Sequence, residues 1–355
     1  MTIEEARALF PVLEHTAYLN AGTFGPLARP TVGAMQTEQA RDLAEGRVGK
    51  EWFERALALR ADLRERLASL VGAETEQVAL TASTTDGCNL VIAGLGLGPD
   101  DEIVTTTDEH FGLLGPLHAS GARVVLVPPD PDAVLAAMTP RTRLLALSEV
   151  TWTTGRRLPL QELRERSGIP VLADCAQSVG AVAVAATGVD FIAFSGQKWL
   201  CGPDATGALV VADPERLRVS RPGYFSQTAH ERDGSYTPRP GAARFEPNWQ
   251  PVGTIVGLIA AIEVAPEWRY EHAAVMTARC RELLEPLVPL EPGDGTLVAF
   301  RAEEPQAVVS HLTERGVVVR EIPDRGLVRA SIGWWTNEDD LQRFASALSD
   351  YGVAS

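Results

Sequence analysis

A single lysine, Lys198, follows an apolar run that is long enough to form one buried strand. The run covers residues 191–194, and Ser195-Gly196-Gln197 separates it from the lysine. A second apolar run, residues 169–173, leads in the same way to Asp174. Taken singly, such a lysine is typical of a solvated loop, and such an aspartate of a turn or a helix N-cap. Together they supply the two groups that pyridoxal 5'-phosphate (PLP) chemistry needs, a Schiff-base lysine and a carboxylate facing the pyridinium nitrogen.

Hydroxyl and amide side chains that could hold a phosphate also follow predicted strands. Thr84 and Thr85 lie between an apolar run that ends near residue 81 and a predicted helix. Free backbone N–H groups at a helix N-terminus, with hydroxyls beside them, suit a phosphate. The alternative is a plain Ser/Thr N-cap. Ser195 and Gln197, just ahead of Lys198, could bind the same phosphate.

Two further polar residues complete the set of candidates at strand ends. His110 follows the apolar run 102–106, and its ring could stack on an aromatic cofactor. By itself, His110 is equally consistent with a surface histidine. Gln177 lies one helical turn beyond Asp174.

The elements that would position these residues alternate between strands and helices. Apolar runs at 77–81, 102–106, 122–127, 143–147, 169–173, 190–194 and 207–212 predict strands, and the patterns at 86–95, 111–119 and 160–167 predict helices. Nearly continuous apolar strands between helices favour a mainly parallel sheet covered on both faces. Ligands of such sheets bind beyond the carboxyl ends of the strands, so the candidate residues should meet at one edge.

The alternation of predicted strands and helices ends at about residue 213. Residues 226–243 are rich in Gly, Pro and polar side chains and read as a long loop. Helices are predicted at 254–264, 271–284 and 337–351, and strands at 297–301, 317–321 and 327–332. We therefore expect an N-terminal segment (1–52), a large α/β domain (53–255) and a smaller α+β domain (256–355).

Composition excludes several classes of function. The net charge of −15 argues against an extended nucleic-acid surface and against binding to anionic lipid. No secretory signal and no apolar stretch that could span a bilayer are visible in the sequence. Four cysteines without a CxxC pair fit the cytoplasm and give no zinc signature, and six scattered histidines give no support for a metal site.

The blocks at 173–178 (Ala-Asp-Cys-Ala-Gln-Ser) and 194–198 (Phe-Ser-Gly-Gln-Lys) carry a family resemblance. The chain resembles the class V aminotransferase-type enzymes of PLP fold type I, which include cysteine desulfurases and isopenicillin N epimerase-like proteins. The resemblance runs from residue 17 to residue 331. It implies a large domain with a mainly parallel seven-stranded sheet, a small C-terminal α+β domain, PLP as cofactor, an amino-acid substrate and a homodimer.

The resemblance also implies a role for each candidate residue. Lys198 would form the Schiff base and move protons at the substrate α-carbon, while Asp174 would pair with the pyridinium N–H and His110 would stack on the ring. Arg329 would bind the substrate α-carboxylate, because the planar guanidinium pairs with a carboxylate bidentately. The other residues implied in the site are Thr84, Thr85, Ser195 and Gln197 at the phosphate, Gln177 near the ring hydroxyl, and Asn20 and Trp152 at the substrate.

The chain departs from the desulfurase pattern at one important place. Desulfurases carry a nucleophilic cysteine shortly before the carboxylate-binding arginine, whereas residues 317–328 contain none. A persulfide-forming desulfurase is therefore disfavoured. The run Trp152-Thr153-Thr154-Gly155 is closer to the isopenicillin N epimerase-like branch.

These features favour a carbon–sulfur β-lyase acting on a cysteine S-conjugate or related sulfur amino acid. A class V aminotransferase and an amino-acid epimerase are the alternatives, and a PLP-binding regulator without catalysis is the reading least supported. The aromatic side chains Phe111, Trp152, Tyr224 and Trp249 could line a bulky substrate pocket, or they could serve core or dimer packing.

Overall fold

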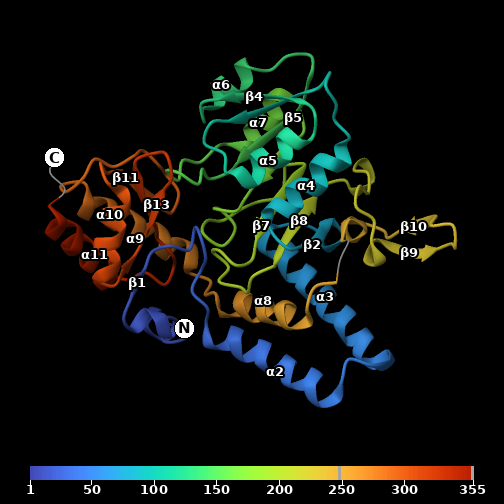
Figure 1. The fold of residues 1–355 in the computed structure, drawn as a ribbon, viewed down its shortest axis with the longest axis horizontal. Coiled ribbons are helices and arrows are strands. Elements are labelled where there is room, and N and C mark those ends of the chain that lie inside the picture. The colour runs from blue at the N-terminus through green and yellow to red at the C-terminus, as the bar shows by residue number, and fades with distance from the viewer. Residues whose placement is uncertain (247–248, 353–355) are drawn as a thin grey trace.

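A seven-stranded sheet forms the centre of the large domain (Figure 1), in a computed structural model that describes residues 1–246 and 249–352. The strand order is β2-β8-β7-β6-β5-β3-β4, and β8 runs antiparallel to both of its neighbours. Each strand predicted for this domain is present. Their bounds are β2 (Val78–Thr81), β3 (Glu102–Thr106), β4 (Arg123–Val127), β5 (Thr142–Ser148), β6 (Val171–Asp174), β7 (Phe191–Ser195) and β8 (Gly207–Val211).

Both faces of this sheet are covered, which explains the continuous apolar runs. Leu144, Ala146 and Leu172 point to one face, where they pack with α4 (Thr84–Leu95) and α5 (Phe111–Ala119). The alternate residues Leu145 and Leu147 point to the other face, which is covered by α3 (Gly49–Val71), α6 (Pro131–Ala136), α7 (Leu160–Ser167) and α8 (Val252–Val264). Asp174 has the same orientation as Leu172 because side chains alternate along a strand. Its carboxylate therefore lies on the face covered by α4 and α5.

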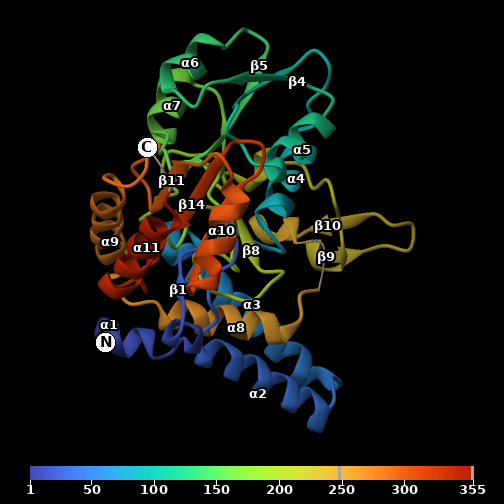
Figure 2. The same ribbon diagram turned by 60° about the vertical axis from the view of Figure 1, so that its left-hand side comes forward.

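The small domain packs helices on a three-stranded antiparallel sheet of order β11-β14-β13 (Figure 2). Its elements are α9 (Arg269–Leu284), β11 (Leu297–Arg301), α10 (Pro305–Glu314), β12 (Val317–Val318), β13 (Arg320–Ile322), β14 (Leu327–Ser331) and α11 (Glu338–Tyr351). The predicted strand 317–321 is divided in two. Its first half pairs with β1 (Ala17–Tyr18), and its second half pairs with β14.

The N-terminal segment connects the two domains. After α1 (Ile3–Arg7), β1 joins the small domain through β12, and Leu19 exchanges backbone hydrogen bonds with Val318 and Ser331. Six residues later, the N–H of Gly25 donates to the carbonyl of Gln197, 2.8 Å away, beside Lys198. The chain then enters α2 (Arg29–Glu45), which packs on α8. The expected boundary at residues 255 and 256 falls inside α8, and the domain limits stay a prediction.

The long loop expected at residues 226–243 is wrong in part. β9 (Gln227–His230) and β10 (Tyr236–Pro238) form an antiparallel hairpin that projects from the large domain (Figure 1). Most of its residues are exposed and polar, so the apolar alternation that marks a half-buried strand is missing. Within the residues that the structure describes, no helix is both long enough and apolar enough to cross a bilayer.

Candidate active site

A cavity of about 170 Å³ opens at the carboxyl ends of the parallel strands. Every residue predicted to bind the cofactor lines it, and so does Trp152. The lining residues from the prediction are Thr84, Thr85, His110, Trp152, Asp174, Gln177, Ser195, Gln197 and Lys198. The structure thus brings together side chains that lie more than one hundred residues apart in the sequence.

Lys198 is held in a desolvated position at the end of β7. Burial and the nearby guanidiniums of Arg329 and Arg320 together lower the pKa of its ammonium group to about 8, against the opposing effect of Asp174. A lysine must lose its proton before it can attack a carbonyl carbon. The site therefore makes the unprotonated, reactive form of Lys198 much more accessible near neutral pH than it is for an exposed lysine.

Asp174 is the last residue of β6 and is buried. One carboxylate oxygen accepts a hydrogen bond from the N–H of Ala176 at 2.9 Å. Burial raises the pKa of Asp174, which Lys198 and the Ala176 N–H partly offset. A buried carboxylate is stabilised by a cationic donor, and a pyridinium N–H is such a donor. Asp174 thus fits the role of partner to the cofactor ring.

The end of the cavity nearest α4 has the donors that a phosphate needs. Ser83 caps this helix by accepting from the N–H of Asp86. The backbone N–H of Thr84 donates to the hydroxyl of Ser195 at 3.0 Å, and the two hydroxyls lie 2.7 Å apart. The side-chain oxygen of Gln197 is buried without a partner among the described residues. Turning this amide would place its N–H₂ group there instead, ready to donate.

His110 lines the cavity as well, directly before α5. Its Nδ1 accepts from the N–H of Gly112 at 3.0 Å, so in the neutral ring the proton is on Nε2. Partial burial and the positive charges of Lys198, Arg320 and Arg329 lower its pKa to about 4. The ring is therefore neutral at pH 7 and contacts the Trp152 ring edge-on, with centroids 5.1 Å apart.

Gln177 lines the cavity, but the polar atoms of its side chain already have protein partners. Its Nε2 donates to the carbonyl of Gly22 at 2.9 Å, and its Oε1 accepts from the indole of Trp199 at 3.0 Å. The amide thereby joins the N-terminal segment to the residue after Lys198. A contact between Gln177 and the ring hydroxyl stays a prediction.

Arg329, on β14, is fully buried beside the cavity. Its NH1 donates to the carbonyl of Trp152 at 2.5 Å, whereas Nε and NH2 have no partner among the residues that the structure describes. Burial lowers the pKa of this guanidinium to about 9. Unpaired buried donors are costly, and a carboxylate would satisfy them. This arrangement fits the predicted role in binding a substrate carboxylate.

A second arginine, Arg320 on β13, was missed by the sequence prediction. Its Cα lies directly opposite that of Arg329 in the antiparallel pair, and its NH1 donates to the hydroxyl of Thr23 at 3.1 Å. Thr23 in turn donates to Asn20 at 2.9 Å. Asn20 therefore contacts Arg320 through Thr23 and is absent from the residues that line the cavity. The signal that would have found Arg320 is the register of a hairpin, which a single sequence does not give.

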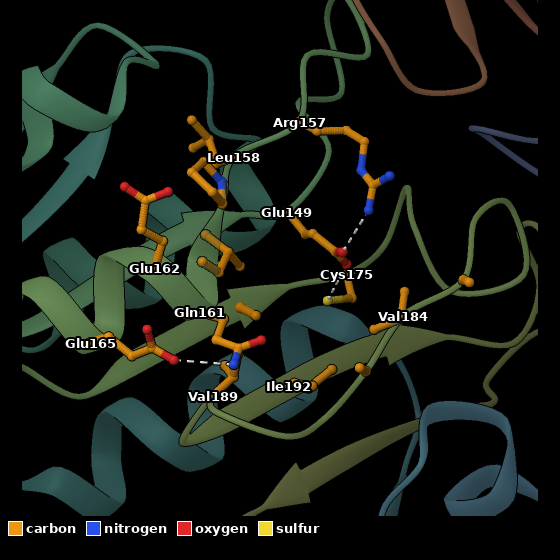
Figure 3. A pocket seen from close by; sticks show the side chains of 15 residues that line it. Glu149, Arg157, Leu158, Gln161, Glu162, Glu165, Cys175, Val184, Val189 and Ile192 are labelled. Atoms are coloured by element: carbon orange, nitrogen blue, oxygen red, sulfur yellow. Dashed lines mark hydrogen bonds and ion pairs between the residues drawn. The ribbon is translucent and has the colours of Figure 1, made fainter.

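A larger cavity, of about 460 Å³, lies on the other face of β6 (Figure 3). There the thiol of Cys175 contacts a carboxylate oxygen of Glu149 at 3.4 Å, and Arg157 lies 3.5 Å from the other oxygen. Burial raises the pKa of this thiol well above its usual value. Cys175 is thus an unreactive buried thiol, as its position beside Asp174 suggested. In residues 1–246 and 249–352, no cluster of His, Cys, Asp and Glu could hold a metal ion.

Comparison with known proteins gives the family. The sequence model described as "Aminotransferase class-V" matches residues 26–344. The chain belongs to the class V aminotransferase family. It is 29% identical to isopenicillin N epimerase of Streptomyces clavuligerus, over 97% of each chain, and 29% identical to cysteine desulfurase CsdA of Escherichia coli, over 96% of each chain.

Solved structures of this family match the whole fold. A variant of the protein C-DES with glycine covalently linked to its PLP cofactor superposes with a TM-score of 0.91 at 26% identity, covering 97% of this chain and 99% of that one. The complex of the cystine C–S lyase C-DES with cysteine persulfide gives 0.89 at 28% identity, covering 96% and 99%. The predicted fold class and the predicted PLP cofactor are confirmed, and this class V chain is a PLP-dependent enzyme. The role of each site residue stays a prediction.

Proposed function

We propose that this enzyme is a carbon–sulfur β-lyase for cysteine derivatives that carry a second carboxylate, such as cystine. The observation that carries the proposal is the position of Arg320 opposite Arg329. Like charges directly opposite each other on neighbouring strands are unfavourable, and two bound carboxylates would relieve the repulsion. The α-carboxylate would bind Arg329, and the distal carboxylate would bind Arg320.

Two further findings support this substrate class. Residues 317–328 contain no cysteine, so the chain lacks a thiol before Arg329 that could accept sulfur. The C–S lyase C-DES, which acts on cystine, is similar over nearly the whole chain. In the net reaction, cystine and water would give pyruvate, ammonia and cysteine persulfide, with the C–S bond broken and no oxidant consumed.

The residues of this chain would have different roles in this reaction. When bound, PLP supplies an electron sink that allows the α-proton of an amino acid to leave. Lys198, with its lowered pKa, would accept that proton. Asp174 would keep the ring nitrogen protonated, and Arg329 would fix the α-carbon above the ring. Thr84, Ser195 and Gln197 would hold the phosphate.

The test is pyruvate release from a set of S-substituted cysteines. We expect kcat/KM for cystine to exceed that for S-methylcysteine, which has one carboxylate, by about ten-fold or more, as for a charge-assisted contact. Arg320→Ala should remove this preference. Arg301→Ala, on the exposed end of β11 in the same sheet, is the matched control. Failure of every sulfur amino acid to yield pyruvate would contradict the proposal.

An epimerase is the second candidate, because an isopenicillin N epimerase is similar over 97% of the chain. Epimerisation would incorporate solvent deuterium at the α-carbon without releasing pyruvate. The remaining alternative, an aminotransferase, would require a 2-oxo acid as second substrate. The same incubations, followed by mass spectrometry and chiral chromatography, separate the three reactions.

The proposal includes a cytoplasmic homodimer. The four cysteines are unpaired, which is usual in a reducing compartment. Phe111, next to His110, and Tyr224 are large aromatic residues that the single chain leaves exposed. Burial of such residues in a dimer interface would stabilise the pair. A single peak at twice the chain mass in light scattering would support the dimer, and a monomer that retains activity would contradict it.

A further inference from the structure

A buried carboxyl group that does not line the cavity lies directly behind the candidate active site. Glu109, between β3 and α5, is 4% exposed. Its Oε1 accepts from the hydroxyl of Thr106 at 2.8 Å, and both of its oxygens accept from the backbone N–H of Ser148 at 3.1 Å. Its Oε2 also contacts the hydroxyl of Ser148. Glu109 thus satisfies several donors at the ends of two neighbouring strands.

These hydrogen bonds hold together two parts of the cofactor site. Ser148 is the last residue of β5, lines the cavity and pairs in register with Asp174 on β6. Glu109 is also the residue immediately before His110. Its side chain therefore fixes the backbone that carries the stacking ring to the strand next to the pyridinium partner.

Further hydrogen bonds hold residues 107 and 108, just before Glu109. Arg325, in the turn between β13 and β14, donates to the carbonyl of Thr107 at 2.7 Å. Thr153 donates to Asp108 at 3.2 Å. The N–H of Thr107 also donates to the carbonyl of Val127 on β4 at 2.8 Å, and the Glu109 carboxyl group adds the bonds to the end of β5.

We propose that Glu109 is a positioning residue of the cofactor site, which holds the His110 ring at its stacking distance and Ser148 in register with Asp174. The inference concerns cofactor binding in the class V fold and does not depend on which substrate the enzyme uses. Burial raises the pKa of Glu109 to about 7, with Asp174 contributing, so near neutral pH the group exists partly as a neutral acid. A glutamine can therefore replace it closely. The amide oxygen would accept from Thr106 and from the Ser148 N–H, and the amide N–H₂ would donate to the Ser148 hydroxyl.

Glu102 offers a matched control. It is an equally buried carboxylate at the first residue of the same strand, β3, where it accepts from Thr139 and Arg141. It lies at the end of the strand away from the cavity. Substitution there tests general damage to β3 without touching the cofactor site.

The experiment titrates PLP into the apoproteins of the wild type, Glu109→Ala, Glu109→Gln and Glu102→Gln. The readouts are the PLP dissociation constant from visible absorbance and the visible circular dichroism of the bound cofactor, which reports how the ring is held. Leaving the donors of Thr106 and Ser148 unpaired should raise the dissociation constant in Glu109→Ala by about ten-fold, with weaker dichroism per bound cofactor. Glu109→Gln should restore both values to within about three-fold of the wild type. Glu102→Gln should bind PLP like the wild type.

Three results would overturn the proposal. The first is a folded Glu109→Ala protein, judged by far-ultraviolet circular dichroism, that binds PLP with unchanged affinity and dichroism. The second is an equal loss in Glu102→Gln, because the effect would then be general destabilisation. The third is a Glu109→Gln protein no better than Glu109→Ala, because hydrogen bonding would then not explain the role. All of these readouts are independent of C–S lyase activity.

Discussion

Arg320 and Arg329 occupy directly opposite positions on the antiparallel strands β13 and β14, so two guanidiniums share one side of the active site. Each lowers the pKa of Lys198. Their repulsion is tolerated because the hairpin between the strands is held by other contacts, including that of Arg325 with Thr107. The free protein therefore stores unfavourable electrostatic energy that an anionic ligand can release.

The first prediction concerns this pair. Arg320→Gln should stabilise the ligand-free protein by about 0.5–1 kcal/mol, because a like-charge cross-strand pair is removed. A dicarboxylate such as succinate should raise the Tm of the wild type more than that of the variant. Thermal unfolding with and without succinate provides the measurement, and Arg301→Gln is the control. Equal shifts in the wild type and Arg320→Gln would show that Arg320 does not bind the second carboxylate.

The second prediction concerns Gly22, whose Cα faces Arg329. A Cβ added at Gly22 would lie 2.7 Å from the Arg329 NH2 and 2.9 Å from the Gln177 Oε1. Gln177 is held by two hydrogen bonds and the Arg329 guanidinium by its NH1, so Gly22→Ala should displace the guanidinium and raise KM for the amino acid by about ten-fold or more. In Gly33→Ala, on α2, the added Cβ meets no atom within 4 Å, and this control should be neutral or slightly stabilising. Unchanged KM in Gly22→Ala would argue against Arg329 as the carboxylate site.

The third prediction is that Lys198 destabilises the apoprotein. Its folded-state pKa is lowered from 10.5 to about 8, so between these values the unfolded chain binds a proton that the folded chain lacks. Stability from this group therefore rises with pH through that window, and the penalty is fully present below pH 8. Lys198→Met should make the apoprotein more stable at pH 7 by about 1–2 kcal/mol, and the difference should vanish above pH 10.5.

Urea unfolding at pH 7 and at pH 10.5 tests this difference. The sequence contains one other lysine, Lys50, which is exposed on α3 and makes Lys50→Met a natural control. The same two lysines make the Schiff base easy to locate. Borohydride reduction of the holoenzyme should attach the cofactor to the peptide that contains residue 198, and attachment to Lys50 would disprove the assignment.

The fourth prediction concerns a buried ion pair that supports the sheet. Glu246 accepts from Arg60 and Arg64 of α3 and from the N–H of Leu80 on β2. Burial alone would raise its pKa, but these donors outweigh that effect and the pKa is lowered. Glu246→Ala would leave the buried Arg60 unpaired and should cost about 3–5 kcal/mol in urea unfolding. Glu54→Ala, which removes an exposed pair with Lys50, should stay within about 0.5 kcal/mol of the wild type.

The sequence was sufficient to predict the sheet and the grouping of the candidate residues at one edge of it, because both depend on local patterns. Seven apolar runs predicted seven strands, which are largely buried except at the edge strand β4, and side chains just past several of them line one cavity. Arg320 was missed because its importance comes from a register between β13 and β14 that no local pattern encodes. The hydrogen-bond partners of Gln177 could not be predicted from the sequence either, since they come from residues 22 and 199. The hairpin of β9 and β10 was missed because its strands are polar on both sides.

The short segment from Leu19 to Gly25 has a mechanical consequence. Backbone hydrogen bonds fix one end to the small domain at Val318 and Ser331, and the other end to Gln197 beside Lys198. Six residues reach at most about 20 Å even when fully extended, and residues 21–23 form a turn, so the segment is a short link between the two domains. We expect that a rotation of the small domain on binding an amino acid would move this link and, through the Gly25–Gln197 hydrogen bond, the backbone that leads to Lys198. Binding of a carboxylate at Arg320 and Arg329 and the orientation of Lys198 would then be coupled through residues 19–25.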